Sequence, residues 1–403
     1  LGLATAVTLA AIALAVPAAW LTTRTDLPGK RIWTVLVALP LVLPSYVAAF
    51  VYMTILAPKG MLQQALEPWL GIERLPSLTG FPGAFLVLTL ISYPFVYLPV
   101  RAALCRMDPA LQEAARSLGA SAWSAFYRVI VPYLRPSVAA GGLLVALYVL
   151  RDFGAVTMWQ YSTFTRVIYN RYLSYKLDAA AALAVMLVIL TIVILVFESR
   201  ARGRARYARL SAGSARTYSP HKLGRWRYPA LFFLIMLVFS SLVLPASGLA
   251  IWLWRGWQNE ATVRITESMQ SNLLSLSQLW SPAWSSFTVS ALAAVLVTFA
   301  ALPLAILIVR RPSRFSQILE KTTYTSFALP GLVVALALVF FCLNYASSLY
   351  QTLPVLLLAY LILFLPQAMG TQRASLLQVT PSLEEAGRSL GSRPSEVLRR
   401  ITL

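Results

Sequence analysis

Two adjacent ionisable residues, Arg151 and Asp152, lie about two thirds of the way through a predicted apolar span at 137–158. Ionisable side chains are costly at membrane depth and often mark the route of an ion or a substrate. Because carboxylate oxygen suits hard cations, Asp152 is a candidate element of a translocation pathway. Alternatively, the pair lies at the outer interface, where the side chains snorkel to water or cap a helix. The sequence leaves both interpretations open.

Other chemistry has little support in the residues. The only histidine, His221, lies in a basic segment, which argues against a histidine-based metal site or triad within the membrane. Cys105 and Cys342 are far apart in or beside apolar runs, so we interpret them as packing residues. Gly29-Lys30 lacks the earlier glycine of a phosphate-binding loop. We therefore predict no catalytic residue, no metal site, no cofactor and no ATPase site on this chain, so it is not expected to be an enzyme.

A polar motif occurs twice in the chain. RAALCRMDPALQEAARSLGAS begins at Arg101, and RASLLQVTPSLEEAGRSLGSR begins 272 residues later at Arg373. Each copy has a capping residue and a proline at the start of a short predicted helix, and a glycine, Gly119 or Gly391, just past its end. Gene duplication alone would explain two ordinary loop helices. The polar core nevertheless matches more closely than the apolar segments do, which suggests two equivalent surfaces for two identical partners.

Nine apolar segments surround the motifs. A bilayer core of about 30 Å needs roughly 20 apolar helical residues, and a chain that is 59% hydrophobic and 12% charged does not fit an ordinary soluble core. Alternate loops carry net positive charge, most of all at 198–228, which places both motifs in the cytoplasm. The net charge of +20 therefore indicates topology rather than a nucleic-acid partner. The expected spans lie at about 3–23, 33–57, 83–104, 137–158, 179–197, 229–254, 285–309, 323–343 and 352–372.

The duplication extends into the apolar segments. Upstream of the motifs the offset is 286 residues, which pairs Arg24 with Arg310 and LPSYVAA at Leu43 with LPGLVVA at Leu329. The 14-residue difference between the two offsets falls in the outer loop at 58–82. Because six spans separate the motifs, the two halves have the same orientation and form parallel repeats.

We predict an all-α, polytopic transmembrane helical bundle of two parallel repeats. The first half lacks one span before its motif and the second lacks two after its motif, so nine spans here imply about twelve in the parent, with both ends cut. The expected domains are a first transmembrane domain at 1–200, a basic cytoplasmic linker at 201–228, and a second transmembrane domain at 229–403.

The repeated motif resembles a known element. EAARSLGAS and EAGRSLGSR are similar to the cytoplasmic EAA loop of permeases in ATP-binding-cassette importers, whose helix docks into a groove on the ATPase subunit. The resemblance covers essentially the whole chain, and the second copy departs from the first where a glycine replaces alanine. It implies an ATPase-coupling role for Glu113, Ala114, Ala115 and Gly119 in the first copy and for Glu385, Ala386, Gly387 and Gly391 in the second.

Two permease halves on one chain, with DFGAV from Asp152 and TFTRVIYNRY from Thr163, resemble the ferric-iron permeases of this superfamily. Fused permeases for thiamine and phosphonate look similar. The resemblance implies a multi-pass protein of the bacterial inner membrane that works with ATP-binding subunits, expected to be two, on the cytoplasmic side. A periplasmic or surface substrate-binding protein would deliver the substrate, and the lipid bilayer would surround the chain.

The resemblance also implies a mechanism. ATP-driven closure of the ATPase subunits would move the two motif helices and rock one half against the other, so that access to the substrate alternates. The rival hypothesis is a secondary transporter driven by an ion gradient through Arg151 and Asp152. A membrane enzyme has less support, because no catalytic cluster is visible in the sequence.

Overall fold

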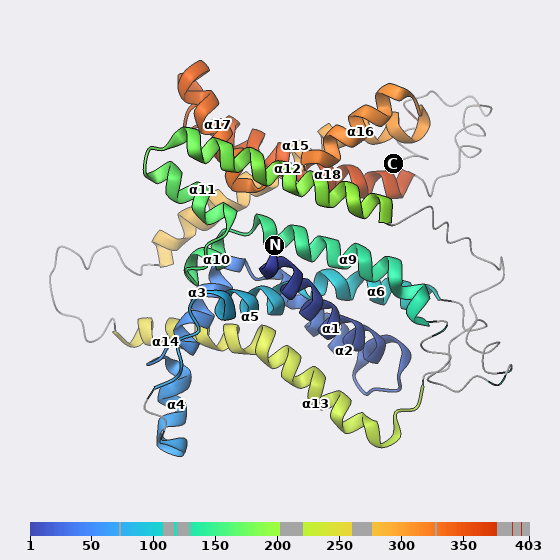
Figure 1. The fold of residues 1–403 in the computed structure, drawn as a ribbon, viewed down its shortest axis with the longest axis vertical. Helices are drawn as coiled ribbons and strands as arrows, with labels where there is room; N and C mark the ends of the chain where they lie inside the picture. Colours follow the sequence, from blue (N-terminus) through green and yellow to red (C-terminus); the bar gives the residue numbers. More distant parts are fainter. Residues whose placement is uncertain are drawn as a thin grey trace. The chain divides into compact units, whose positions relative to one another are not determined.

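The protein is described by a computed structural model that covers residues 1–71, 74–107, 117, 119, 128, 130–201, 221–259, 276–326, 329–376, 389 and 396 (Figure 1). These residues form helices and connecting turns, and the β-structure among them is one isolated bridge between Thr25 and His221. The predicted all-α class is therefore confirmed. Contacts divide the chain into two units, Leu1–Val263 and Arg264–Leu403.

Most of the predicted spans appear as long apolar helices. In the described part of the chain, eight helical stretches are long and apolar enough to cross a membrane. The ninth predicted span, at 323–343, is represented by the 15-residue apolar helix α17 (Gly331–Tyr345). The eight stretches are Gly2–Arg24, Ser45–Gln64, Phe81–Cys105, Val131–Arg151, Leu177–Ile194, Gly224–Arg255, Trp280–Arg310 and Leu353–Arg373.

The first unit is built around three helices that contact one another, α1 (Gly2–Arg24), α6 (Pro94–Arg106) and α9 (Val131–Arg151) (Figure 1). The approach of α6 to α9 depends on Gly141. A Cβ atom at this position would lie 2.6 Å from the Cα of Val96 and 2.8 Å from the carbonyl oxygen of Phe95. Because these are backbone atoms, only glycine lets the two helices pack this closely.

The other elements of this unit pack around these helices. The short helix α10 contacts α3 and α5, and α11 contacts α12. The helix that runs from α13 through a π-helical turn to α14 contacts α2 and α3. The elements are α2 (Lys30–Ala38), η1 (Leu39–Val42), α3 (Ser45–Leu56), α4 (Met61–Leu70), α5 (Phe81–Ser92), α10 (Gly154–Met158), α11 (Phe164–Leu173), α12 (Leu177–Ala201), η3 (Gly224–Trp226), α13 (Arg227–Val238), η4 (Phe239–Val243) and α14 (Leu244–Asn259).

Helices α13 and α14 contain the predicted span 229–254, which the sequence assigns to the second domain. In the structure this span packs within the first unit, where a Cβ at Gly248 would lie 2.6 Å from Val51 on α3. The two units are defined by which helices pack together, whereas the predicted boundaries at 1–200, 201–228 and 229–403 are defined by the sequence repeat. These domain boundaries therefore stay a prediction.

The second unit contains α15 (Leu276–Arg310), α16 (Arg314–Ser326), α17, η6 (Ser347–Leu349) and α18 (Leu353–Leu376). Helix α18 contacts α15, α16 and α17. The small core between α15 and α18 includes Ala301, Ala305 and Met369, which are fully buried. Helix α18 therefore holds the unit together.

Elements of the second unit begin and end at the positions that the repeat predicts. Helix α17 begins 286 residues after α3, and α18 begins 272 residues after α5. Helices α1 and α15 end at the paired arginines, Arg24 and Arg310. Helix α4 lies in the loop at 58–82 to which the sequence assigns the extra residues of the first repeat.

Two predicted spans need correction because they are interrupted at a proline, so neither 33–57 nor 323–343 is one continuous helix. The helices α3 and α17 start afresh after Pro44 and Pro330, which have nearly the same extended conformation, with φ −60° and ψ 137° in the first and φ −62° and ψ 137° in the second. A proline also restricts the residue before it to extended conformations, and Leu43 has φ −73° and ψ 120°. The break thus follows from the Leu-Pro pair that both repeats contain.

Candidate functional site

The predicted ATPase-coupling motifs lie mostly outside the described residues. Gly119 is described and has a φ of +84°. Glycine favours this left-handed region, which is common at the residue that follows a helix. The coupling role stays a prediction, because the other residues to which it is assigned lie outside the described part of the chain. They are Glu113, Ala114, Ala115, Glu385, Ala386, Gly387 and Gly391.

The residues that lead into the first motif are described, and a buried arginine binds them. Helix α6 ends at Arg106, and Met107 is extended, with φ −69° and ψ 126°. Arg24, the last residue of α1, is only 3% exposed. Its Nη2 donates hydrogen bonds to the carbonyl oxygens of Leu104 and Met107, the second at 2.9 Å. The guanidinium therefore binds the carbonyl end of α6 directly before the predicted short helix of the motif.

The loop after Arg24 is joined to the segment that precedes α13. The carbonyl oxygen of Arg24 accepts a hydrogen bond from the His221 amide at 2.8 Å, and the His221 carbonyl accepts one from the Asp26 amide at 3.1 Å. The Asp26 carboxylate accepts a third from the Leu223 amide at 2.9 Å. This last bond lowers the pKa of the Asp26 carboxyl below its ordinary value. His221 therefore takes part in a structural junction through its backbone.

The structure corrects the predicted position of Arg151 and Asp152. Helix α9 ends at Arg151, and Asp152 leaves the helix with φ −65° and ψ 135°. The pair thus lies at the end of a helix rather than two thirds of the way through a span at 137–158. The guanidinium of Arg151 lies 6.0 Å from the centre of the Tyr148 ring.

The carboxylate of Asp152 binds the start of the next helix, α10. Its Oδ1 accepts hydrogen bonds from the amides of Ala155 at 2.9 Å and Val156 at 3.4 Å. The Thr165 hydroxyl donates to the backbone carbonyl of Asp152 at 2.7 Å. Asp152 is 7% exposed. This geometry is that of a helix cap, and a pathway role for Arg151 and Asp152 stays a prediction.

Three buried tyrosines were not singled out in the sequence. Tyr52 donates to the carbonyl oxygen of Ser240 in the π-helical turn η4. The hydroxyls of Tyr93 and Ser241 lie 3.4 Å apart, and those of Tyr97 and Thr22 lie 3.0 Å apart. A tyrosine needs a hydrogen-bond partner when it is buried. Tyrosines within apolar segments of the sequence were therefore the signal that could have pointed to these contacts.

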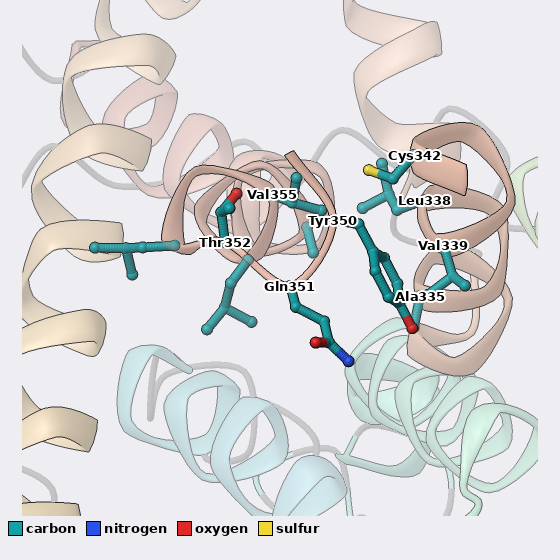
Figure 2. A pocket seen from close by; sticks show the side chains of 11 residues that line it. Ala335, Leu338, Val339, Cys342, Tyr350, Gln351, Thr352 and Val355 are labelled. Carbon is teal, nitrogen blue, oxygen red and sulfur yellow. The ribbon is translucent and has the colours of Figure 1, made fainter. Parts of the chain in front are cut away.

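The second unit has an apolar groove between α17 and α18, with a volume of about 540 Å³. Figure 2 shows the Tyr350 ring beside Ala335 and Val339 of α17, while Thr352 is drawn farther from the ring than Gln351. The groove is lined by Ala335, Leu338, Val339 and Cys342 of α17, by Tyr350, Gln351 and Thr352, and by Leu353, Val355, Leu356 and Ala359 of α18.

In the first unit, Gly83, the counterpart of Val355, is covered by Trp159. The backbone carbonyl of Trp159 accepts a hydrogen bond from the Gly80 amide at 2.6 Å, and the Trp159 ring lies 2.0 Å from where a Cβ atom of Gly83 would be. Trp159 follows α10, the helix that Asp152 caps. Among the described residues, no group of three or more His, Cys, Asp and Glu side chains is placed to hold a metal ion.

Comparisons with known proteins give matches over most of the chain. Residues 7–202 and 298–403 match the family described as binding-protein-dependent transport system inner membrane component. The chain is 34% identical over 399 residues to the Fe(3+)-transport system permease protein FbpB 2 of Haemophilus influenzae, a match that covers 98% of this chain and 73% of the relative.

The chain is also similar, over shorter stretches, to permeases whose names give other substrates. It is 34% identical over 137 residues to the molybdenum transport system permease protein ModB of Escherichia coli K12, which covers 34% of this chain and 58% of the relative. It is also 34% identical over 140 residues to a probable sulfate transport system permease protein of Chlorokybus atmophyticus, which covers 35% of this chain and 48% of the relative.

Proposed function

Because the chain belongs to the family of inner membrane components of binding-protein-dependent transport systems, we propose that it moves ferric iron into the cytoplasm. One observation carries the choice of substrate. The match to the ferric-iron permease covers 98% of this chain and therefore includes both repeats, whereas the matches to the molybdenum and sulfate permeases cover 34% and 35%.

The chain is a multi-pass protein of the inner membrane and the permease subunit of an ATP-binding-cassette importer. Importers of this family contain ATP-binding subunits and use a substrate-binding protein. In the proposal, two ATP-binding subunits bind on the cytoplasmic side, one at each motif, and the binding protein docks on the outer side. The permease itself then has no catalytic residue, no cofactor and no ATPase site.

The proposed mechanism transmits force through the two motifs. Closure of the ATP-binding subunits moves the motif helices, and each motif moves the helix that precedes it, α6 in the first repeat and α18 in the second. Since α6 contacts α1 and α9, while α18 contacts α15, α16 and α17, a displacement of either helix is passed to its neighbours. Arg151 and Asp152 are the candidate pathway residues of this proposal.

The substrate is tested by uptake into proteoliposomes that contain the full-length permease, its ATP-binding subunits and its binding protein. We expect ATP-dependent accumulation of labelled ferric iron that exceeds the accumulation of molybdate, sulfate, thiamine or phosphonate. Preferential uptake of one of these other solutes would replace iron as the substrate. Uptake that persists without ATP-binding subunits but collapses with the proton gradient would favour a secondary transporter.

The coupling role is tested by replacing Gly119 and Gly391 with tryptophan. No described atom lies within 4 Å of a Cβ built on Gly119, so a large side chain there meets none of the described residues, and in this proposal it would obstruct the docked partner. We expect co-purification of the ATP-binding subunits and uptake to fall at least about tenfold, the size of effect that follows from a steric clash at an interface.

The matched control is Gly71→Trp. Gly71 also has a positive φ, +61°, with no atom of the described residues within 4 Å of the added Cβ, and it lies in the loop at 58–82 that the charge pattern places outside. This variant carries the same backbone strain and should retain assembly. Normal assembly and uptake of the Gly119→Trp and Gly391→Trp variants would refute the docking role.

A further inference from the structure

We infer that Arg24 is a positioning residue that couples the first ATPase-docking motif to the rest of the permease, and that Arg310 does the same for the second. The inference rests on the proposed function, because it assumes that the motifs dock the ATP-binding subunits. It concerns residues outside the motifs, at the points where α1 and α15 end.

The side chain of Arg24 binds the residues directly before the predicted motif helix. A helix end leaves its last carbonyls without partners in the helix, and a cation at that end complements the partial negative charge of the carbonyls. The buried guanidinium supplies this cation to Leu104 and Met107, and Met107 is the residue before the motif helix is expected to start. A displacement of the motif therefore reaches α1 through two charged hydrogen bonds.

A second contact ties the same two helices together. The hydroxyls of Thr22 on α1 and Tyr97 on α6 lie 3.0 Å apart, and both residues are buried. Tyr97 precedes Leu104 by about two helical turns, so α1 and α6 are joined at two levels. Two levels of attachment let α1 follow both a shift and a tilt of α6.

The backbone of Arg24 extends this connection beyond α1. Its carbonyl accepts the hydrogen bond from His221, and the residues after it bind the segment 221–223 that leads into α13. Arg24 thus contacts the end of α6 with its side chain and the approach to α13 with its backbone. A movement of the motif can pass through one residue to α1 and to α13.

The repeat supplies independent support. Arg310 ends α15 as Arg24 ends α1, and Leu376, the counterpart of Leu104, is 2% exposed on α18, which packs along α15. The sequence offsets that pair these residues differ, 286 for the arginines and 272 for the leucines. Even so, each arginine ends its helix, and each leucine lies in the helix that precedes the predicted motif helix of its repeat.

The test compares Arg24→Met, Arg24→Lys and the control Arg31→Met in the full-length permease assembled with its partners. Arg31 is an exposed residue of the neighbouring helix α2. Three quantities are measured for each variant: the melting temperature, the co-purification of ATP-binding subunits, and the substrate taken up per ATP hydrolysed. A residue that only stabilises the fold would change the first quantity and leave the third unchanged.

We expect Arg24→Met to lower uptake per ATP about tenfold, as the loss of two charged hydrogen bonds allows. Arg24→Lys should restore part of the coupling, because lysine keeps the charge but not the planar fork. Arg31→Met should behave as the wild type, and Arg310→Met should reproduce the loss of coupling. Unchanged uptake per ATP in Arg24→Met would overturn the inference, whatever happens to its melting temperature.

The result also separates this inference from the proposed function. If Gly119→Trp abolishes docking while Arg24→Met couples normally, the motif docks the ATPase and Arg24 has no part in transmission, which refutes this inference alone. If Gly119→Trp and Gly391→Trp also assemble and transport normally, the docking role itself is refuted.

Discussion

Asp152 stabilises the backbone at a point where a membrane helix stops. Its carboxylate accepts hydrogen bonds from two amides at the start of α10, and its own carbonyl accepts one from Thr165. An unsatisfied backbone amide is costly away from water, and a carboxylate is a strong acceptor for it. These bonds account for the burial of Asp152 without any contact with a substrate.

Substitutions of Asp152 distinguish its role in capping α10 from a role in the translocation pathway. Asp152→Ala removes the acceptor and should lower the free energy of unfolding by about 1 kcal/mol, whereas Asp152→Asn keeps an acceptor and should change it by a few tenths at most. Thermal unfolding in detergent measures both. Uptake by the Asn variant then decides the pathway role: normal transport would remove Asp152 from the route, and lost transport at unchanged stability would place its charge there.

The residue type of Asp152 was enough to predict its possible roles from the sequence. Its position just past the end of α9 was not predicted. An acidic residue in an apolar run predicts either a pathway or a cap, and both were recognised. The apolar run continues through Met158, however, so hydropathy did not show that α9 ends at Arg151. The partner of its backbone carbonyl, Thr165, lies 13 residues further along the chain, and this contact becomes visible only once the chain is folded.

Close helix packing in the first unit depends on which atoms face each glycine. Gly141 faces the backbone of α6, while the neighbouring Gly142 faces the tips of the Ile12 and Thr8 side chains, 3.3 Å from a built Cβ. Side-chain tips can move aside, but the backbone of a packed helix can do so only if the whole helix shifts. The two glycines therefore differ in how strictly the fold requires them.

Gly141→Ala should destabilise the permease by about 1–3 kcal/mol, because the added methyl group forces α6 away from α9. The matched variant Gly142→Ala should be neutral or slightly stabilising, since alanine favours a helix by roughly 0.5–1 kcal/mol over glycine. Melting temperatures of the two purified variants test this difference. Equal stability of both variants would show that α6 has the freedom to shift without cost.

Hydropathy predicted where the apolar helices lie, but it did not predict where these helices are interrupted. Apolar residues continue on both sides of Pro44 and Pro330, so each region satisfied the length criterion for one span although the helix restarts at the proline. The internal repeat contained the missing information, because LPSYVAA and LPGLVVA place the same Leu-Pro pair at the same point in both halves. A local motif that recurs at a helix start was therefore a better guide than mean hydropathy.

At the scale of the whole molecule, packing crosses the duplication boundary. The predicted span 229–254 belongs by sequence to the second half, yet α13 and α14 bind the first unit through several contacts. Tyr52 and Tyr93 bond to the π-helical turn, and Gly248 lies against α3. The sequence repeat shows which half of the duplication the span 229–254 comes from. Where the span packs depends on the fit between its side chains and those of α2 and α3, which the repeat does not contain.

Cleaving the chain between residues 202 and 220, at a protease site introduced into the full-length permease, tests this packing. The contacts of 221–223, α13 and α14 with the first unit should keep both products together in detergent after cleavage. Gly248→Leu should then reduce co-purification of the two products, because a Cβ at this position already lies 2.6 Å from Val51 and 3.0 Å from Ile55 and a larger side chain would push α14 from α3. Ala246→Leu, at an exposed position of the same helix, is the control and should leave the products together. If both variants separate to the same extent after cleavage, the contact of α14 with α3 does not hold the two halves of the chain together.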